Sequence, residues 1–206
     1  ILLFIALTFI TSTVMSSDAI GFFALIVMFL TFVKLLTKPK ENLSFQSFEI
    51  WLIAYFMIVI ISLFGSTLFS LSLKGFFKTF VYLGFYFSVA QYLKNHKNHT
   101  LWILAIIGLC TASETIVGFM QSFLHLDAIS TWQDTSSINP EDVISRVYGT
   151  LQPLNPNLFG GYLIAGYPIF LGSTLYFGLK KNLQGVGISL ILALLGVYTI
   201  FQTGCR

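Results

Sequence analysis

Charged residues are scarce in this sequence. They make up 9% of its 206 residues, whereas hydrophobic residues make up 56%. A soluble domain usually has about a quarter of its residues charged, so the charge here is too sparse to cover a globular surface. Because the apolar residues also come in long runs, we predict an all-α, polytopic transmembrane helical bundle. Runs such as 50–64 do not alternate apolar and polar residues, which argues against a transmembrane barrel.

Cysteines are also few, and basic runs are missing. Cys110 and Cys205 lie far apart, without the spacing of a disulfide framework or of a metal site. The formal net charge is only +3, and no basic run carries interleaved aromatic residues, so we do not expect nucleic acid as a partner. Phosphate-loop, dinucleotide and nucleophile-elbow motifs do not occur. We therefore expect no cofactor and no metal, and the lipid bilayer is the first expected partner.

The apolar runs predict about seven membrane spans within one transmembrane domain, residues 1–206. Each run is near the roughly 20 residues that cross a bilayer core. We expect a tight polar turn at 16–18, a serine-rich turn at 66–78 and a long polar extracytoplasmic loop at 124–156. The spans are expected at 1–15, 19–36, 48–65, 76–93, 101–123, 158–177 and 186–201.

Lysine and arginine are unevenly divided between the two sides of the predicted bundle. The loops after the second, fourth and sixth spans hold seven of them, and the opposite side holds four. Cytoplasmic loops carry an excess of Lys and Arg, so we predict that the even-numbered loops face the cytoplasm. The 124–156 loop then faces outward, and Arg146 and Arg206 reach the same outer face.

The start of the sixth span and the two arginines indicate an anion site at that face. Asn155 suits the cap position and Pro156 the first helical position, so the first turn would offer free N–H groups that favour anions. The guanidinium groups of Arg146 and Arg206 suit phosphate, carboxylate or bicarbonate. The alternative for the helix start is an ordinary capped helix. The alternative for Arg206 is a side chain that extends to the membrane interface.

Arg146 also has a simpler interpretation. It could be a loop arginine paired with Glu141 or Asp142, a contact worth little at a surface. The loop also contains His125, but no second histidine or thiolate accompanies it to form a metal site.

Polar residues within two spans are further candidates. Glu114 lies inside the fifth span, where a carboxylate is costly and usually faces a bundle interior or a watery cavity. Gln121 lies two turns further along nearly the same face. Glu114 is either a proton or substrate relay or a hydrogen-bonded structural residue. In the sixth span, the spacing of Gly161 and Ala165 allows close helix packing.

An ordered set of motifs resembles the O-antigen ligase/polymerase superfamily of membrane proteins. The closest resemblance is to its cyanobacterial branch, commonly labelled as bicarbonate (inorganic-carbon) transporters. Gln121 also falls where that family often has a glutamine that closes the span before the loop. The motifs are Ser130-Thr131-Trp132-Gln133-Asp134, Ser145-Arg146-Val147-Tyr148, Asn155-Pro156-Asn157-Leu158 and Thr203-Gly204-Cys205-Arg206.

The resemblance implies a bacterial plasma (inner) membrane protein with an anionic substrate. In one alternative it moves bicarbonate, which the arginines would gather while Glu114 couples protons or gates. In the other it is a glycan ligase or polymerase that transfers sugar from an undecaprenyl-diphosphate carrier, with Arg146 and Arg206 neutralising the leaving group. A structural membrane subunit is a third alternative, and a thylakoid membrane remains open beside the plasma membrane. The residues expected at the substrate are Arg146, Arg206, Gln121, Asn155, Asn157 and Tyr148.

The sequence departs from that family at three places. Gln152-Pro153-Leu154 lengthens the turn before Asn155, Cys205 replaces a serine, and the chain stops before the glycine expected after Arg206. The chain starts at Ile1 and ends directly after an apolar run, so we expect the N-terminal part of a longer protein. The catalytic histidine of the ligases lies beyond this part, so catalytic residues are unknown and enzyme activity stays open.

Overall fold

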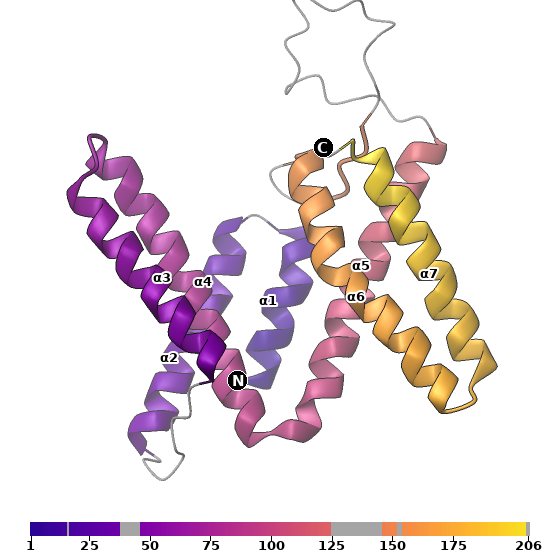
Figure 1. The fold of residues 1–206 in the computed structure, drawn as a ribbon, viewed down its shortest axis with the longest axis horizontal. Helices are drawn as coiled ribbons and strands as arrows, with labels where there is room; N and C mark the ends of the chain where they lie inside the picture. The colour runs from indigo at the N-terminus through magenta and orange to yellow at the C-terminus, as the bar shows by residue number, and fades with distance from the viewer. Residues whose placement is uncertain (16, 38–45, 125–145, 152–153, 205–206) are drawn as a thin grey trace, which may run out of the picture. The chain divides into compact units, whose positions relative to one another are not determined.

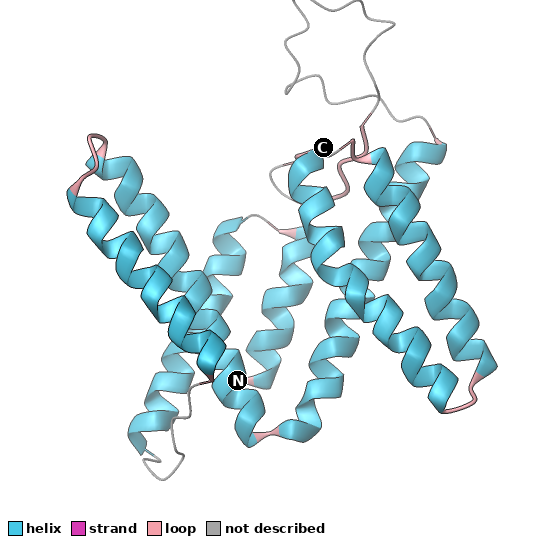
Figure 2. Cartoon of the chain, in the orientation of Figure 1, coloured by secondary structure: helices cyan, strands magenta, loops and turns pink. Residues whose placement is uncertain are grey.

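The computed structural model describes residues 1–15, 17–37, 46–124, 146–151 and 154–204. Within these residues every regular element is helical (Figures 1 and 2). The all-α prediction is therefore confirmed. The elements are α1 (Leu2–Val14), α2 (Ser17–Thr37), α3 (Ser47–Phe64), α4 (Phe69–Asn95), the short 3₁₀ helix η1 (Lys97–His99), α5 (Thr100–Phe123), α6 (Pro156–Leu179) and α7 (Leu183–Gln202).

Five of the described helices, α2, α3, α5, α6 and α7, are long and apolar enough to cross a membrane. This number is that of a multi-pass membrane protein. The other two expected spans coincide with α1 and α4. Helix α1 is apolar but has 13 residues. Helix α4 has 27 residues and carries Lys74, Lys78 and Lys94, which lower its hydropathy.

Helix α4 begins earlier than the sequence predicted. We expected a serine-rich turn at 66–78, but the helix already starts at Phe69, so Lys74 and Lys78 lie on it. The stretch contains no proline, and lysine is a good helix former, so these residues do not interrupt the helix. Helix α2 starts at Ser17, so Ser17 and Asp18 lie in the helix and not in the turn expected at 16–18.

The chain forms two compact units. The first consists of Ile1–Thr8 and Ser17–Ile103, and the second of Phe9–Ser16 and Leu104–Arg206. In the first unit, α4 packs against both α2 and α3. The rings of Phe56 and Phe76 stack across α3 and α4, with centroids 5.5 Å apart.

In the second unit, α6 packs against α7, and small residues bring α5 close to both. A Cβ atom on Gly166 would lie 2.2 Å from the Thr111 hydroxyl oxygen, and one on Gly118 would lie 2.5 Å from Thr199. The close approach of α6 therefore occurs at Gly166. The expected pair Gly161 and Ala165 is exposed, and a Cβ on Gly161 would meet nothing within 4 Å.

Candidate functional site

The residues just before α6 form an irregular segment, 146–151, whose backbone one glutamine holds against α5. The side-chain oxygen of Gln121 accepts hydrogen bonds from the backbone N–H groups of Tyr148 (3.2 Å) and Gly149 (2.9 Å). Its amide nitrogen donates to the carbonyl oxygen of Gly149 (3.1 Å). A buried loop needs partners for its backbone groups, and Gln121 supplies three of them.

The same segment also packs into the apolar interior of the second unit. Val147 and Leu151 are buried and form a cluster with Phe159 and Leu163 of α6. The backbone N–H of Val147 donates to the carbonyl oxygen of Gln202 at the end of α7 (3.2 Å). The ends of α5 and α7 and the start of α6 thus meet at one end of the unit, as the predicted topology requires.

Gly149 is the position at which this segment needs glycine. Its φ angle is +64°, in the left-handed region that side chains disfavour. A Cβ atom there would lie 2.4 Å from the ring of Phe159 and 2.7 Å from a carboxyl oxygen of Glu114. Conformation and space therefore both exclude a side chain.

Glu114 is the single described acidic residue of the second unit, and it is 2% exposed. Its Oε2 accepts a hydrogen bond from the backbone N–H of Thr150 (3.1 Å). The Thr150 hydroxyl lies within hydrogen-bonding distance of Glu114 Oε1 and of the Thr13 carbonyl oxygen on α1 (2.5 Å to the latter). A hydroxyl has one hydrogen and a carbonyl only accepts, so the Thr150 hydroxyl shares its hydrogen between the two oxygens or donates to one of them. Through this hydroxyl, Glu114 on α5 is connected to α1.

Arg146 is the first residue of the 146–151 segment, and two neutral acceptors hold its side chain. Its Nε donates to the carbonyl oxygen of Thr203 and its Nη2 to the side-chain oxygen of Asn157, both at 2.7 Å. These bonds use two of the five N–H donors of the guanidinium group. In the described part of the chain, no carboxylate lies within salt-bridge distance of Arg146. The side chain is therefore fixed in place while its charge is not neutralised by these partners.

The start of α6 differs from the expectation in one respect. Asn155 caps the helix and Pro156 occupies its first position, as predicted. However, the Asn155 side chain accepts from the N–H groups of Asn157 (2.8 Å) and Leu158 (3.4 Å), and its carbonyl accepts from Phe159. The first-turn N–H groups are thus already bonded within the chain. An anion at this site would meet Arg146 rather than a row of free backbone donors.

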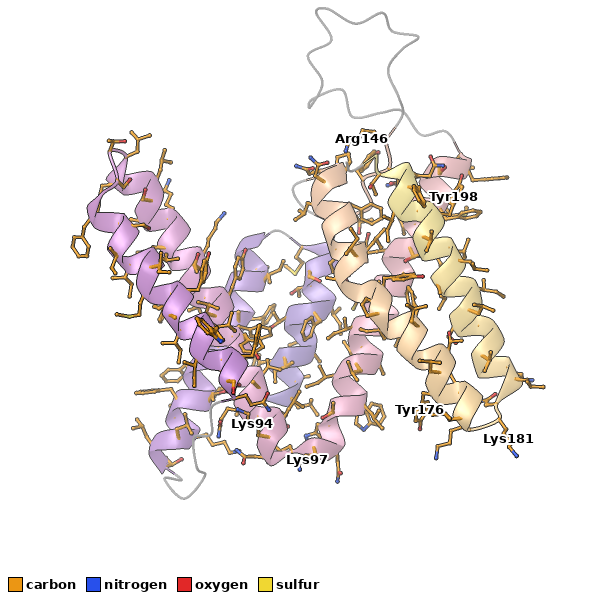
Figure 3. The ribbon with its side chains drawn as sticks, viewed as in Figure 1. Lys94, Lys97, Arg146, Tyr176, Lys181 and Tyr198 are labelled. Carbon is orange, nitrogen blue, oxygen red and sulfur yellow. The ribbon has the colours of Figure 1, made fainter. Side chains whose placement is uncertain are left out.

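Charge is separated along the second unit (Figure 3). Its described basic residues are Arg146, Lys180 and Lys181. Arg146 lies at the end where α6 begins, and the two lysines follow α6 at its other end. This arrangement makes the two ends of the unit electrostatically distinct.

The structure brings most of the predicted site residues to this one end. Arg146 contacts Asn157 directly, while Gln121 and Glu114 both bind the backbone of the 146–151 segment. Arg206 lies outside the described residues, but Gly204, two residues earlier, approaches Arg146 so closely that a Cβ there would lie 3.1 Å from Nε. Of the other predicted residues, Asn155 caps α6, and the backbone N–H of Tyr148 donates to Gln121.

Sequence analysis missed Thr13, Thr150 and Thr203 at this site. Thr150 adjoins a glycine turn, but its partner Thr13 is 137 residues away along the chain. Thr203 contributes a backbone carbonyl, which every residue type has. The one sequence signal for the end of α7 was the motif at 203–206, which begins with Thr203.

No protein-family model matches this chain, and no curated protein or solved structure shows significant similarity to it. Functional inference therefore rests on the residues themselves and on their geometry.

Proposed function

We propose that this chain belongs to an integral membrane protein that binds an anionic substrate at the outer face of the bacterial plasma membrane. The observation that carries the proposal is the setting of Arg146. Two neutral acceptors orient its guanidinium group, and three of its N–H donors are not engaged by the described residues. Such a preorganised fork suits phosphate or carboxylate oxygens and needs no further ordering when the anion arrives.

In this proposal α1 and α4 also cross the membrane, which gives seven spans. The orientation follows from the positive charges, because Lys180 and Lys181 would face the cytoplasm and Arg146 the outside. The resemblance of the Arg146, Asn155 and Thr203 motifs to the O-antigen ligase/polymerase superfamily supports the same location.

The substrate class that the geometry supports best is a diphosphate-linked lipid carrier of a glycan. Val147 and Leu151 of the segment that carries Arg146 form an apolar cluster with Phe159 and Leu163 of α6. An anion held at Arg146 therefore stays at the membrane edge, where the headgroup of a lipid carrier lies. Arg146 would neutralise the diphosphate during sugar transfer to an acceptor.

Bicarbonate transport is the second candidate, and one observation favours it. Glu114 is buried, and its carboxyl group contacts the Thr150 hydroxyl, which also contacts Thr13. An acid buried inside a span of a bundle that also carries an arginine suits proton-coupled anion movement. The arginine would gather the anion, and Glu114 would exchange the proton.

Binding of lipid phosphates to the purified protein tests the first candidate. We expect undecaprenyl diphosphate to bind more tightly than undecaprenyl monophosphate, and Arg146→Ala to weaken the binding about ten-fold or more, because hydrogen bonds to charged groups contribute ~1.5–3 kcal/mol. Arg146→Lys should restore only part of the affinity, since lysine keeps the charge but loses the fork. Lys181→Ala, at the other end of the unit, is the matched control.

A cellular assay separates the two candidates. The gene is deleted and then complemented with the original gene or with Arg146→Ala, and both surface-glycan length and labelled bicarbonate uptake are measured. Glycan loss with normal uptake supports the lipid-carrier function. Reduced uptake with unchanged glycan supports transport instead. If Arg146→Ala complements both phenotypes fully, the anion site itself is refuted.

A further inference from the structure

The first unit contains a cavity of about 370 Å³ that the anion site does not involve. Ligand pockets commonly range from about 300 to 1,000 Å³ and are mostly apolar with a few polar groups. The cavity lies among α2, α3 and α4. Its apolar wall is formed by Met28, Phe32, Leu35, Ile53, Gly84 and Phe87, and its polar wall by Thr31, Glu49, Ser88, Gln91 and Lys94.

The polar wall lies where the helices end. Glu49 is in the first turn of α3, and Lys94 is in the last turn of α4. The Lys94 ammonium group bonds both carboxyl oxygens of Glu49, at 3.0 and 2.9 Å. A second lysine of this region, Lys34, lies in the last turn of α2. Such helix ends lie at the headgroup layer when the helices span a bilayer.

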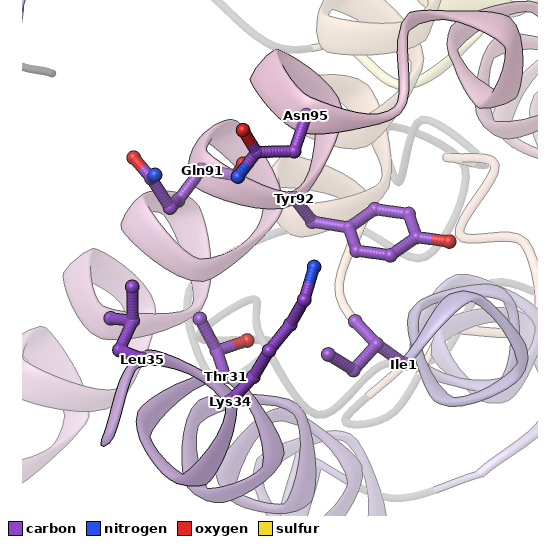
Figure 4. Close-up of a pocket in the computed structure, with 7 residues that line it drawn as sticks. All are labelled: Ile1, Thr31, Lys34, Leu35, Gln91, Tyr92 and Asn95. Carbon is purple, nitrogen blue, oxygen red and sulfur yellow. The ribbon is translucent and has the colours of Figure 1, made fainter. Parts of the chain in front are cut away.

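One polar group at this wall has no partner. The Thr31 hydroxyl is buried, the residue being 7% exposed, and its oxygen makes no hydrogen bond to the described residues. A buried hydroxyl without a partner costs free energy, so a native environment normally supplies one. Thr31 also lines a second, smaller hollow between α2 and α4, which shares Leu35 and Gln91 with the cavity (Figure 4).

The smaller hollow shows which chemistry surrounds Thr31. Its volume is about 10 Å³, which is room for about one water molecule. Lys34 extends from α2 into it, toward Tyr92 of α4 (Figure 4). The Lys34 ammonium group lies 3.5 Å from His96 Nε2 and 6.0 Å from the centre of the Tyr92 ring. Lys34 and the Thr31 hydroxyl therefore both line this hollow, which adjoins the polar wall of the larger cavity.

We propose that this cavity binds one anionic phospholipid of the bilayer. An acyl chain occupies the apolar part between α2, α3 and α4. The Thr31 hydroxyl donates to an oxygen of the lipid's ester or phosphate, and the basic residues Lys34 and Lys94 at these helix ends favour an anionic headgroup. A lipid chain suits this wall because it brings no backbone amide groups that would need partners.

Native mass spectrometry of the purified protein tests the proposal. The protein is reconstituted with equal amounts of phosphatidylglycerol and phosphatidylethanolamine and then released from the membrane mimetic. We expect one phosphatidylglycerol to stay bound. Ser88→Leu fills the cavity and should abolish this retention. Ser62→Leu is the matched control, because Ser62 is exposed on α3 and bonds its own helix as Ser88 does, so it should retain the lipid.

Two further variants test the polar wall. Thr31→Val keeps the shape and removes the hydroxyl, so lipid retention should fall by roughly two- to ten-fold, the worth of one hydrogen bond. Thr31→Val removes a group without a partner, so it should fold well. If Ser88→Leu does not fold, lipid retention by Thr31→Val tests the proposal instead. Lys34→Gln should lower the preference for the anionic lipid. Absence of a retained lipid in the original protein, or retention unaffected by Thr31→Val, overturns the proposal, and equal retention of both headgroups overturns the charge selection.

Discussion

Glu114 combines burial with a complete set of hydrogen bonds, which is how a membrane protein can tolerate an acid inside a helix. Oε2 accepts from the Thr150 backbone, and Oε1 contacts the Thr150 hydroxyl, which also contacts the Thr13 carbonyl. Buried polar groups normally have hydrogen-bond partners of this kind, because leaving them without partners is costly. The residue therefore joins the 146–151 segment to two helices.

The hydrogen bonds of Glu114 predict the effect of two substitutions. Glu114→Gln places an amide donor and a carbonyl acceptor at the same positions, so the free energy of unfolding should change by less than about 0.5 kcal/mol. Glu114→Ala loses these bonds and leaves a cavity, which should cost about 2 kcal/mol or more. Unfolding in mixed micelles with increasing dodecyl sulfate, followed by circular dichroism, measures both. Equal losses of stability in the two variants would contradict the role of these hydrogen bonds.

Gly149 gives a second prediction at this scale. Gly149→Ala forces a left-handed conformation on alanine, at about 1–2 kcal/mol, and drives its Cβ against Phe159. We expect a loss of unfolding free energy of at least that size in the same micelle assay. Gly161→Ala is the control, because its Cβ meets nothing and alanine favours a helix by about 0.5–1 kcal/mol. The idea fails if both variants shift stability in the same direction.

Helix α6 is the element that organises the second unit, and its start is defined by Asn155. The asparagine accepts from two first-turn N–H groups, and Pro156 needs no acceptor at the first position. Asn157, one residue into the helix after Pro156, then holds Arg146. Asn155 therefore fixes both the start of α6 and the position of Asn157, which orients Arg146.

A change at the cap should act on α6 and on Arg146 together. Asn155→Ala should lower the unfolding free energy by about 1 kcal/mol, and Asn155→Ser should retain most of the stability, since serine is also a good cap. Anion affinity at Arg146 should follow the same order, because a frayed first turn displaces Asn157. Binding and unfolding measured on the same protein samples test this, and a loss of affinity in Asn155→Ser equal to that in Asn155→Ala would argue against it.

The elements were predictable from sequence to different degrees. Most helices lie within a few residues of their expected ranges, because membrane spans are continuous apolar runs. The early start of α4 was missed because Lys74 and Lys78 resemble loop residues although they fit a helix. Gln121 and Glu114 were correctly placed on one face of α5 by helical periodicity. The bond from Thr150 to Thr13 could not be foreseen, since no local pattern relates residues 137 positions apart.

At the scale of the whole molecule, the charge distribution predicts an orientation. In a background with Cys110→Ala and Cys205→Ala, Ser122→Cys marks the Arg146 end of the second unit, because Ser122 lies in the last turn of α5 next to Gln121. Lys181→Cys marks the opposite end. A maleimide that does not cross membranes should label Ser122→Cys in intact spheroplasts and Lys181→Cys only after permeabilisation. The reversed pattern would invert the orientation, and labelling of both from one side would contradict a spanning α6.

The bonds of the 146–151 segment also constrain how the molecule is synthesised. The segment bonds α1 through Thr13 and the end of α7 through Gln202 and Thr203, over separations along the chain of 137 and 57 residues for its Thr150 and Arg146 contacts. During synthesis the ribosome must therefore extend the chain beyond α7 before Arg146 can acquire its second anchor. Thr13 is synthesised first, and the helices between α1 and the end of α7 must be inserted before both contacts can form. The hydrogen-bonded arrangement around Arg146 is among the last parts of this region to form, so an incompletely inserted chain would carry these residues without their geometry.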